Sequence, residues 1–225
     1  MLGKLGPTMK KLILLLLLLS APTWAHDFWL KPDGGGVVMI YGEAGESEPY
    51  KADMIKSVMG WATGGAKRDV KKSFANDQLK LVGKGVSAWT VEVDNGYWTK
   101  TETGWKNIGK KQQPDALKAT WDRHFAKMVT VKNPDLVTGQ ALEIVLSKAT
   151  PSLLEGKVLL RGKPAPGLDL ELNHEKVGKT DADGKFSFTT AGTGLVLLAA
   201  HHQEKLEGNP EADFLNLESA LTIKL

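Results

Sequence analysis

One histidine in this sequence could become an amino terminus, which would give a single residue two metal-binding nitrogens. His26 follows Thr23-Trp24-Ala25, a small-x-small pattern typical of signal-peptidase cleavage sites. Cleavage after Ala25 would expose the α-amine of His26 beside its own imidazole, and the two can close a chelate ring on a divalent ion. The α-amine has a reference pKa of about 7.7–8.0, so a metal displaces its proton readily near neutral pH. We therefore predict a metal site at the mature amino terminus.

A second imidazole is needed for a nitrogen-rich site, and four more histidines are available. His201 and His202 end an apolar run and are the favoured candidates. At most one of them can join a given site, because successive side chains of a strand point to opposite faces. The alternative for this pair is a strand end that meets solvent. His124 is interpreted as the edge of a helix and His174 as a turn residue, so neither is predicted to bind metal.

Carboxylate oxygens are offered by the glycine-rich stretch from residue 42 to residue 48. Glu43 is the candidate there for a ligand near His26, and the alternative is a loop whose carboxylates face water. The pattern Asp181-x-Asp183-Gly184 favours a tight turn over a calcium loop, because a calcium loop needs a glutamate farther along. The sequence has no nucleophile elbow and no phosphate-binding glycine loop. We therefore predict no catalytic residues, and a protein that is not an enzyme.

The first 25 residues have the pattern of a secretory signal peptide. Lys10 and Lys11 precede an apolar core over residues 12–19, which is shorter than the roughly 20 residues of a membrane span. We expect cleavage after Ala25, a periplasmic location and no membrane anchor in the mature chain. Met1 and Met9 are both possible starts, because the leader is complete from Met9 onward.

Composition narrows the range of partners. The three lysines of the leader account for the formal net charge of +3, so the mature chain is neutral. A neutral chain argues against nucleic acid or an anionic membrane as a partner. The sequence has no cysteine, which excludes disulfides and thiolate metal ligands. A length of 225 residues allows one sandwich or two small β domains after removal of the leader.

Short apolar runs separated by glycine and proline predict a mostly β protein. These runs cover residues 37–41, 142–146, 168–172, 186–188, 195–200 and 220–225. The dipeptide Asn95-Gly96 predicts a tight turn within a β-hairpin over residues 88–101. Four apolar residues at helical spacing after Pro114 predict one short helix. They are Leu117, Trp121, Phe125 and Met128.

Strands at this spacing are typical of a Greek-key β-sandwich of immunoglobulin-like type. We place a domain boundary at Thr150-Pro151. It divides the mature chain into an N-terminal β domain, residues 26–150, and a C-terminal immunoglobulin-like domain, residues 151–225. The strand over residues 142–146 could belong to either domain.

The segment Ala25-His26-Asp27-Phe28-Trp29-Leu30-Lys31-Pro32 resembles the start of the mature chain in a known family. This is a periplasmic family of unknown function that is described as a nickel/cobalt uptake component. Gly162-Lys163-Pro164, the apolar strand into His201-His202 and the ending Glu218–Thr222 look similar as well. The resemblance implies an all-β fold, a periplasmic location, and a role near the uptake of Ni²⁺ or Co²⁺ with an inner-membrane metal importer as partner.

One departure from the family pattern affects the expected ligands. Many relatives carry a histidine in the loop after the first strand, where this sequence reads Tyr41-Gly42-Glu43-Ala44-Gly45-Glu46. The ligands that remain for Ni²⁺, Co²⁺ or Cu²⁺ are His26, one of His201 and His202, and Glu43 or Glu46. Two other functions stay open at this point: a sandwich module that binds a protein or glycan without metal, and a histidine-brace copper enzyme acting on polysaccharide.

Overall fold

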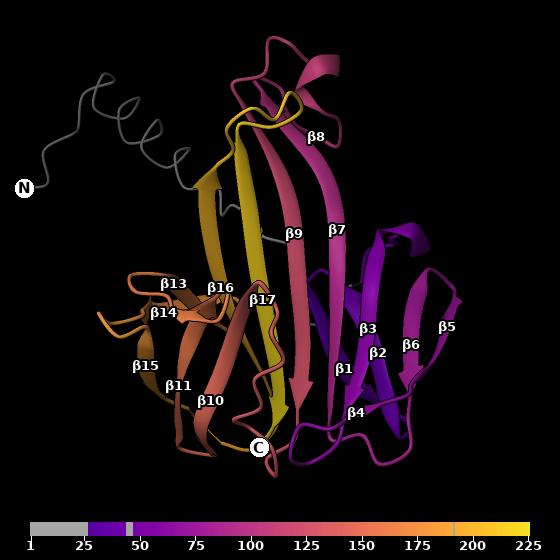
Figure 1. The fold of residues 1–225 in the computed structure, drawn as a ribbon, viewed down its shortest axis with the longest axis vertical. Coiled ribbons are helices and arrows are strands. Elements are labelled where there is room, and N and C mark those ends of the chain that lie inside the picture. Colours follow the sequence, from indigo (N-terminus) through magenta and orange to yellow (C-terminus); the bar gives the residue numbers. More distant parts are fainter. Residues whose placement is uncertain (1–26, 44–46, 191) are drawn as a thin grey trace, which may run out of the picture.

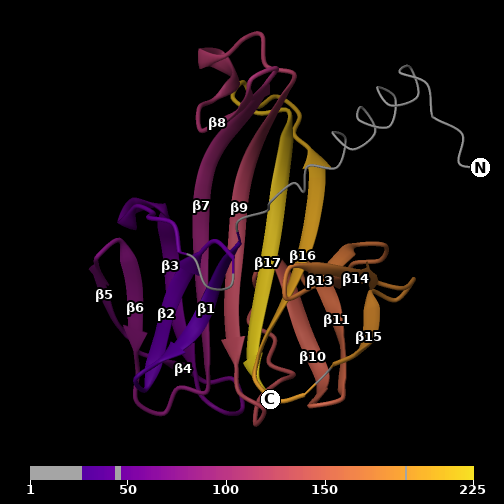
Figure 2. The same cartoon turned by 180° about the vertical axis from the view of Figure 1, so that it is seen from behind.

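The computed structural model describes residues 27–43, 47–190 and 192–225, and most of these residues lie in β-strands. The strands form three sheets, which Figures 1 and 2 show from opposite sides. The predicted mostly β class and sandwich architecture are therefore confirmed. The leader and His26 lie outside the described residues. Within the described part of the chain, no helix has the length and hydropathy of a membrane span.

A nine-stranded sheet forms the centre of the molecule. Its strands follow the order β14-β13-β16-β17-β9-β7-β3-β4, and β8 is added beside β7. Neighbouring strands are antiparallel except for β17 and β9, which run parallel. The bounds are β3 Ile55–Trp61, β4 Lys67–Arg68, β7 Ala88–Thr101, β8 Gly104–Lys106, β9 Lys118–Val129, β13 Asp169–Leu172, β14 Glu175–Lys179, β16 Leu195–Lys205 and β17 Phe214–Lys224.

Two smaller sheets lie on either side of the central one. The first has the order β1-β2-β6-β5, and the second joins β10, β11, β12 and β15. Their bounds are β1 Phe28–Asp33, β2 Gly36–Tyr41, β5 Lys71–Ala75, β6 Gln78–Val82, β10 Leu142–Thr150, β11 Leu153–Leu160, β12 Lys163–Pro164 and β15 Lys185–Thr189. Two short 3-10 turns, η1 Ala52–Met54 and η2 Lys110–Gln112, complete the described elements.

Alternation along the central strands explains why both faces are covered. Phe125 and Val129 of β9 pack into the core shared with β10 and β11, whereas Ala126 and Met128 pack into the core shared with β1 and β2. Successive side chains of a strand point to opposite faces, so an apolar residue at nearly every position requires a partner sheet on each side. Full burial of one large apolar side chain contributes roughly 1.5–3 kcal/mol, which makes these two cores the main source of stability.

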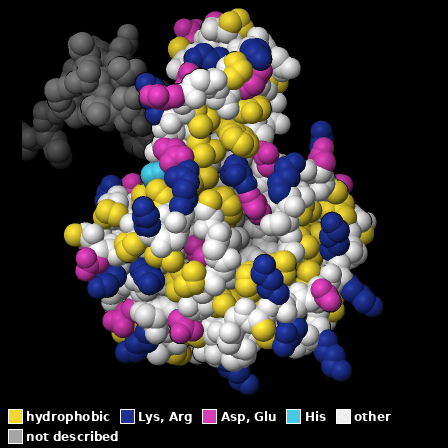
Figure 3. Space-filling model, in the orientation of Figure 1, with side chains coloured by type: hydrophobic (Ala, Val, Ile, Leu, Met, Phe, Trp, Pro, Cys, Tyr) yellow, Lys and Arg dark blue, Asp and Glu magenta, His cyan; other side chains and the backbone are white. Residues whose placement is uncertain are grey.

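Four strands of the central sheet extend beyond both smaller sheets. Figures 1 and 2 show β7, β9, β16 and β17 continuing past them, with β8 beside the far end. In Figure 3, charged side chains of both signs are spread over the visible face, and hydrophobic side chains follow the extension. Trp105 and Leu117 are among the exposed large hydrophobic residues. The polar site described below lies on the long strands, beside the start of β1.

The predicted helix is wrong, because its residues form β9. This strand pairs with β7 on one side and with β17 on the other. A spacing of four residues is also a multiple of the strand period of two, so Trp121 and Phe125 share a face in either structure. Met128 lies on the opposite face, and Leu117 precedes the strand and is exposed. Backbone pairing with β7 and β17 therefore stabilises a strand here in spite of the helical spacing of the apolar residues.

The predicted hairpin over residues 88–101 is also wrong, because β7 runs through this segment as one long strand. Asn95-Gly96 forms a bulge in β7, where the register against β9 shifts between Asp94 and Gly96. Gly96 has φ +76°, and its N–H donates to Asp94 Oδ1 at 3.0 Å. Asn95-Gly96 can adopt the backbone conformation of a turn. Because β9 pairs with β7 on both sides of this dipeptide, the strand bends there but does not reverse.

The predicted domain boundary at Thr150-Pro151 falls at the turn between β10 and β11, which pair with each other. Strands from both sides of the boundary share the central sheet. In particular, β17 pairs with β9 from Phe214–Thr120 to Ile223–Val129. The division into two domains stays a prediction, and the shared sheet makes it testable.

Candidate functional site

Three ionisable residues stand side by side on three adjacent strands of the central sheet. His201 of β16 is the register partner of Glu218 of β17, and Glu218 is the register partner of His124 of β9. Residues that are directly opposite each other in a sheet place their side chains on the same face. This face is the one covered by β1, since Ala126, two residues after His124, packs into the core shared with β1. β1 therefore covers part of this row of three residues, His201, Glu218 and His124.

Asp27 lies over this row, immediately before β1. Its side chain is 2% exposed. Phe28 holds the start of β1 against the central sheet, because its ring meets that of His124 edge-on with centroids 5.0 Å apart. Trp29 packs on residues of β16 and β17. As a result, Asp27, His124 and Glu218 each bring one possible ligand atom within 4.8 Å of the others.

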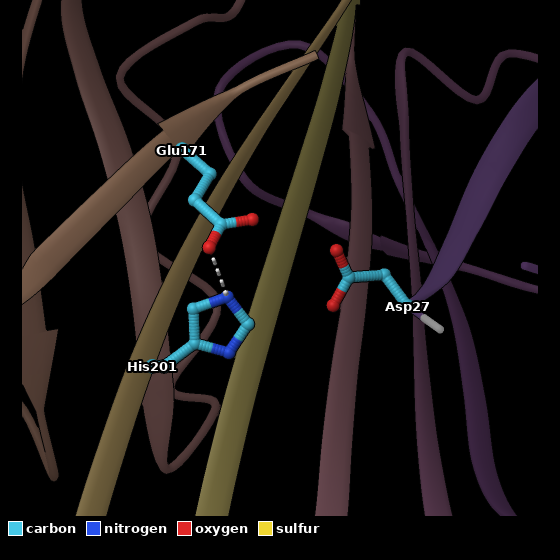
Figure 4. A group of neighbouring side chains, drawn as sticks. All are labelled: Asp27, Glu171 and His201. Atoms are coloured by element: carbon cyan, nitrogen blue, oxygen red, sulfur yellow. Dashed lines mark ion pairs between the residues drawn. The ribbon is translucent and has the colours of Figure 1, made fainter. Parts of the chain in front are cut away.

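The β13–β14 hairpin adds a second group around the same carboxylate. Asp27, Glu171 and His201 also place one ligand atom each within 4.8 Å of the others. Glu171 Oε1 is 3.8 Å from His201 Nε2, and the Asp27 carboxylate points toward the His201 ring from another side (Figure 4). His174, in the turn of the hairpin, has Nδ1 3.9 Å from Asp27 Oδ2. Asp27 thus links both groups into one cluster.

The bulge in β7 brings an amide to the edge of the cluster. Asn95 is 8% exposed, and its Nδ2 lies 3.3 Å from His124 Nε2. The two ends of the Asn95 amide suit either state of His124 Nε2, because its NH₂ group donates to an unprotonated nitrogen and its oxygen accepts from a protonated one. Asn95 therefore helps to orient the His124 ring, and Gly96 allows the bend that puts Asn95 there.

The contacts between histidines and carboxylates lie at or beyond the length of a good hydrogen bond. His124 Nδ1 is 3.2 Å from Glu218 Oε2, and His201 Nδ1 is 3.9 Å from the same oxygen. Among the described residues, no hydrogen bond reaches the buried atoms Asp27 Oδ2, His124 Nδ1, His174 Nε2 and His201 Nε2. Two ligands at about 2.0–2.2 Å from one ion lie about 3–4 Å apart. The separations therefore suit ligands that share an ion.

The charges in the cluster shift its pKa values in opposite directions. Burial, followed by the negative charge of Glu218, raises the pKa of Asp27 to about 7. Burial also acts to raise the pKa of Glu218, but the positive charges of His124 and His201 outweigh it and lower this pKa to about 2. Burial opposes protonation of His201, but Glu171, then Glu218 and Asp27, outweigh it and raise its pKa to about 9. Without metal, the positive charges of His124 and His201 offset the negative charge of Glu218.

Of the five candidate metal ligands named from the sequence, the structure places His201 in the cluster. His202 points to the other face of the sheet, with Nε2 3.5 Å from Glu204, as strand alternation requires. Glu43 belongs to neither of the two groups found among the described residues. His26 and Glu46 lie outside the described residues, and His26 directly precedes Asp27 in the sequence.

Sequence reasoning missed most of the cluster. Glu171 is not among the sequence candidates, Asp27 and Glu218 enter only as parts of family motifs, and His124 is interpreted as the edge of a helix. His174 lies in a turn as predicted, but no contact with Asp27 follows from that prediction. The sequence does contain one indication that Glu218 is a functional residue. It is the only charged residue in the run from residue 214 to residue 223. The proximity of the cluster residues could not be predicted, because it depends on the order of β13, β16, β17 and β9 in one sheet and on the packing of β1 over that sheet.

The comparisons with solved structures include the central fibronectin-III array of RIM-binding protein. It is 14% identical, with a TM-score of 0.23, over 89% of this chain and 70% of that chain. A likeness this weak carries no argument about fold or function. The search of curated proteins finds no match.

A protein-family model gives a much more extensive match. The model, Domain of unknown function (DUF4198), covers residues 23–204. The matched range includes Asp27, His124, the β13–β14 hairpin and His201, and it ends before Glu218. Because the match spans well over half of the sequence, the chain belongs to the DUF4198 family.

Proposed function

We propose that this protein binds a divalent transition-metal ion at the cluster around Asp27. The proposal is carried by one observation: two groups of possible ligands, His124 with Glu218 and His201 with Glu171, share the buried carboxylate of Asp27, whose Oδ2 has no hydrogen bond among the described residues. A buried polar atom without a partner requires an explanation, and a bound ion is one that the donor set fits. Imidazole together with carboxylate suits Ni²⁺, Co²⁺, Cu²⁺ and Zn²⁺.

The mature amino terminus extends this proposal. Cleavage after Ala25 would leave His26 as the first residue, directly joined to Asp27. The α-amine and the imidazole of His26 would then add two nitrogen donors to the side chains described above. Binding by the cluster and binding by the amino terminus can be tested separately.

The biological role that we propose is non-enzymatic. The predicted export to the periplasm and a site of this donor set support a protein that receives Ni²⁺ or Co²⁺ outside the inner membrane. It would pass the ion to a metal importer in that membrane. The family resemblance of the Ala25–Pro32 segment is the further support for this role.

The most direct test replaces Asp27 by asparagine. The Asp27→Asn variant keeps the shape of the side chain and removes a charge that burial disfavours, so we expect its thermal stability without metal to equal or exceed that of the wild type. Isothermal titration with Ni²⁺, Co²⁺, Cu²⁺ and Zn²⁺ should show binding to the wild type. The variant should bind at least about tenfold more weakly, since loss even of a group that only orients a ligand costs about 10–100-fold.

His202→Ala is the matched control, because it removes an imidazole from the same strand on the opposite face of the sheet. Its metal affinity should equal that of the wild type. Equal affinity of the Asp27→Asn variant and the wild type would refute the site. If the wild type binds none of the four ions, the proposed function is wrong.

The contribution of His26 is measured on the secreted protein. Mass analysis should show a chain that begins at His26, and elemental analysis of the same sample reports bound metal. One residue added before His26 converts its amine to an amide, which cannot chelate in the same way. We expect this addition and His26→Ala to weaken binding, and unchanged affinity in both would restrict the site to the residues of the cluster.

A further inference from the structure

The turn of the β13–β14 hairpin has an unusual residue at a position that favours glycine. The turn consists of Asn173 and His174, between the paired residues Leu172 and Glu175. Both turn residues have positive φ, +50° for Asn173 and +67° for His174. Two-residue hairpin turns of this kind prefer asparagine followed by glycine, because a side chain at the second position is strained. An imidazole therefore stands where backbone geometry alone would select glycine.

The turn is held in place by backbone contacts with β16. Asn173 N–H donates to the carbonyl of Leu197 at 2.8 Å, and Asn173 Oδ1 accepts from Leu197 N–H at 3.0 Å. Leu197 in turn packs with Trp29 of β1. The hairpin tip is thus fixed beside β1, and the position of His174 follows from this attachment.

His174 faces the cluster from the turn. Its Nδ1 is 3.9 Å from Asp27 Oδ2, the buried oxygen to which no hydrogen bond runs among the described residues. Its Nε2 is buried as well and is also without a hydrogen bond in that part of the chain. The separation of 3.9 Å is too long for a hydrogen bond and falls within the range of about 3–4 Å expected for two ligands of one ion.

We propose that His174 is a further imidazole ligand of an ion bound at Asp27, which makes the site one for nitrogen-preferring ions such as Cu²⁺, Ni²⁺ and Zn²⁺ and excludes Mg²⁺ and Ca²⁺. This inference rests on the proposed function and deepens it. Mg²⁺ and Ca²⁺ take oxygen ligands, and each imidazole that replaces an oxygen shifts a site toward the later transition metals. The strained residue places a ring nitrogen 3.9 Å from Asp27 Oδ2, which glycine could not do.

The experiment compares the wild type with His174→Gly and His174→Asn. Glycine converts the turn to Asn-Gly and relieves the strain, and asparagine tolerates the same φ, so both variants should fold at least as well as the wild type. Thermal unfolding without metal checks this. Titration with Zn²⁺ and Ni²⁺ should show at least a tenfold loss of affinity in both variants, whereas the wild type should not bind Mg²⁺ or Ca²⁺ at millimolar concentrations.

X-ray absorption of the Zn²⁺-loaded full chain separates a ligand from a structural contact, because it counts imidazoles around the ion. We expect one imidazole fewer in His174→Gly, and no change in His202→Ala. An unchanged imidazole count or an unchanged affinity in both His174 variants overturns this inference and leaves the proposed function intact. Failure of the wild type to bind Zn²⁺, Ni²⁺, Co²⁺ or Cu²⁺ overturns the proposed function itself, and this inference with it.

Discussion

At the scale of single residues, the fold buries a cluster of ionisable side chains, although burial disfavours their charged forms. The side chains of Asp27 and His124 are 2% and 4% exposed, although both carry ionisable groups. Buried charges are tolerated only when they are paired or bind a metal ion. The pKa of Asp27 is raised to about 7 and that of Glu218 is lowered to about 2. In the metal-free protein the histidines therefore stabilise the charge of Glu218 more than that of Asp27. Sites of this kind are typical of functional positions.

The pKa of His201 predicts a pH dependence of stability in the metal-free protein. This pKa rises from 6.5 to about 9 on folding, chiefly because Glu171 and Glu218 outweigh the effect of burial. Protonated His201 therefore contributes stability that is fully present below pH 6.5 and is lost as the pH rises through about 9. We expect the free energy of unfolding of the wild type to decrease over this interval by on the order of 1–3 kcal/mol more than that of His201→Gln.

Urea unfolding in the presence of a chelator, at several pH values, measures this difference. His202→Gln is the control, because His202 lies on the same strand and faces away from the cluster. The same pH profile for wild type and His201→Gln would show that His201 is not stabilised in its protonated form.

At the scale of elements, the bulge of β7 connects backbone conformation to the site. Gly96 at φ +76° allows the bend that points Asn95 toward His124. Bulges redirect side chains in this way next to functional sites. The turn-forming pair Asn95-Gly96 therefore bends a long strand and directs the Asn95 amide toward the His124 ring.

Replacement of Gly96 by alanine should affect both stability and binding. We expect Gly96→Ala to lower the free energy of unfolding by about 1 kcal/mol, because a side chain is strained at this φ. Metal affinity should fall as well, because Asn95 no longer orients His124. Gly85→Ala is the matched control: Gly85 has φ +68° and lies in a loop elsewhere. Gly85→Ala should lose a similar amount of stability and keep its metal affinity. Equal metal affinities of wild type, Gly96→Ala and Gly85→Ala would show that the bulge does not contribute to metal binding.

A buried ion pair fixes the loop between β9 and β10. The side chains of Lys127 and Glu143 are each 1% exposed, with Nζ and Oε1 2.7 Å apart. Glu143 Oε1 also accepts hydrogen bonds from the N–H and hydroxyl of Thr138, and Oε2 accepts one from Gly139 N–H. This network holds the loop over residues 130–141 to the central sheet.

Removal of one partner should be costly. Lys127→Met leaves the Glu143 carboxylate buried without its cation, and we expect a loss of about 3–5 kcal/mol in the free energy of unfolding. The double variant Lys127→Met with Glu143→Gln should lose less than the single variant, because the neutral amide can still accept from Thr138. Chemical denaturation measures both, and a double variant less stable than Lys127→Met would contradict this account.

At the scale of the whole molecule, the parallel pairing of β17 with β9 joins the last strand to a strand from the middle of the chain. The core between the central sheet and β10–β11 contains residues from both sides of residue 150, such as Phe125 and Leu221. A fragment that ends at residue 150 would expose the edge of β9 and half of this core. Such edges and faces favour aggregation over independent folding.

We therefore predict that the full chain unfolds in one cooperative transition, with equal calorimetric and van't Hoff enthalpies. The fragment of residues 27–150 should show no cooperative transition when it is expressed alone. Differential scanning calorimetry of both proteins makes the test. Two separate transitions in the full chain, or a cooperatively folded fragment, would instead support two independent domains divided at Thr150-Pro151.

Periodicity in the sequence was sufficient for the class of fold and for most strands. The apolar runs at 37–41, 142–146 and 195–200 lie in β2, β10 and β16. The turn at Asp181 also followed from local chemistry, because its Oδ1 accepts hydrogen bonds from the N–H groups of Asp183 and Lys185. These features depend on contacts between near neighbours, which a sequence displays directly.

Only the tertiary structure decided the course of β7 and β9 and the membership of the site. Helical spacing and strand spacing coincide at Trp121 and Phe125, and pairing with β7 and β17 selected the strand. Asp27 and Glu218 are separated by most of the chain and meet because β1 lies across β17. Local interactions act over a few residues, whereas such a meeting depends on which strands pair and which sheet covers which face, and that is determined by the packing of the complete chain.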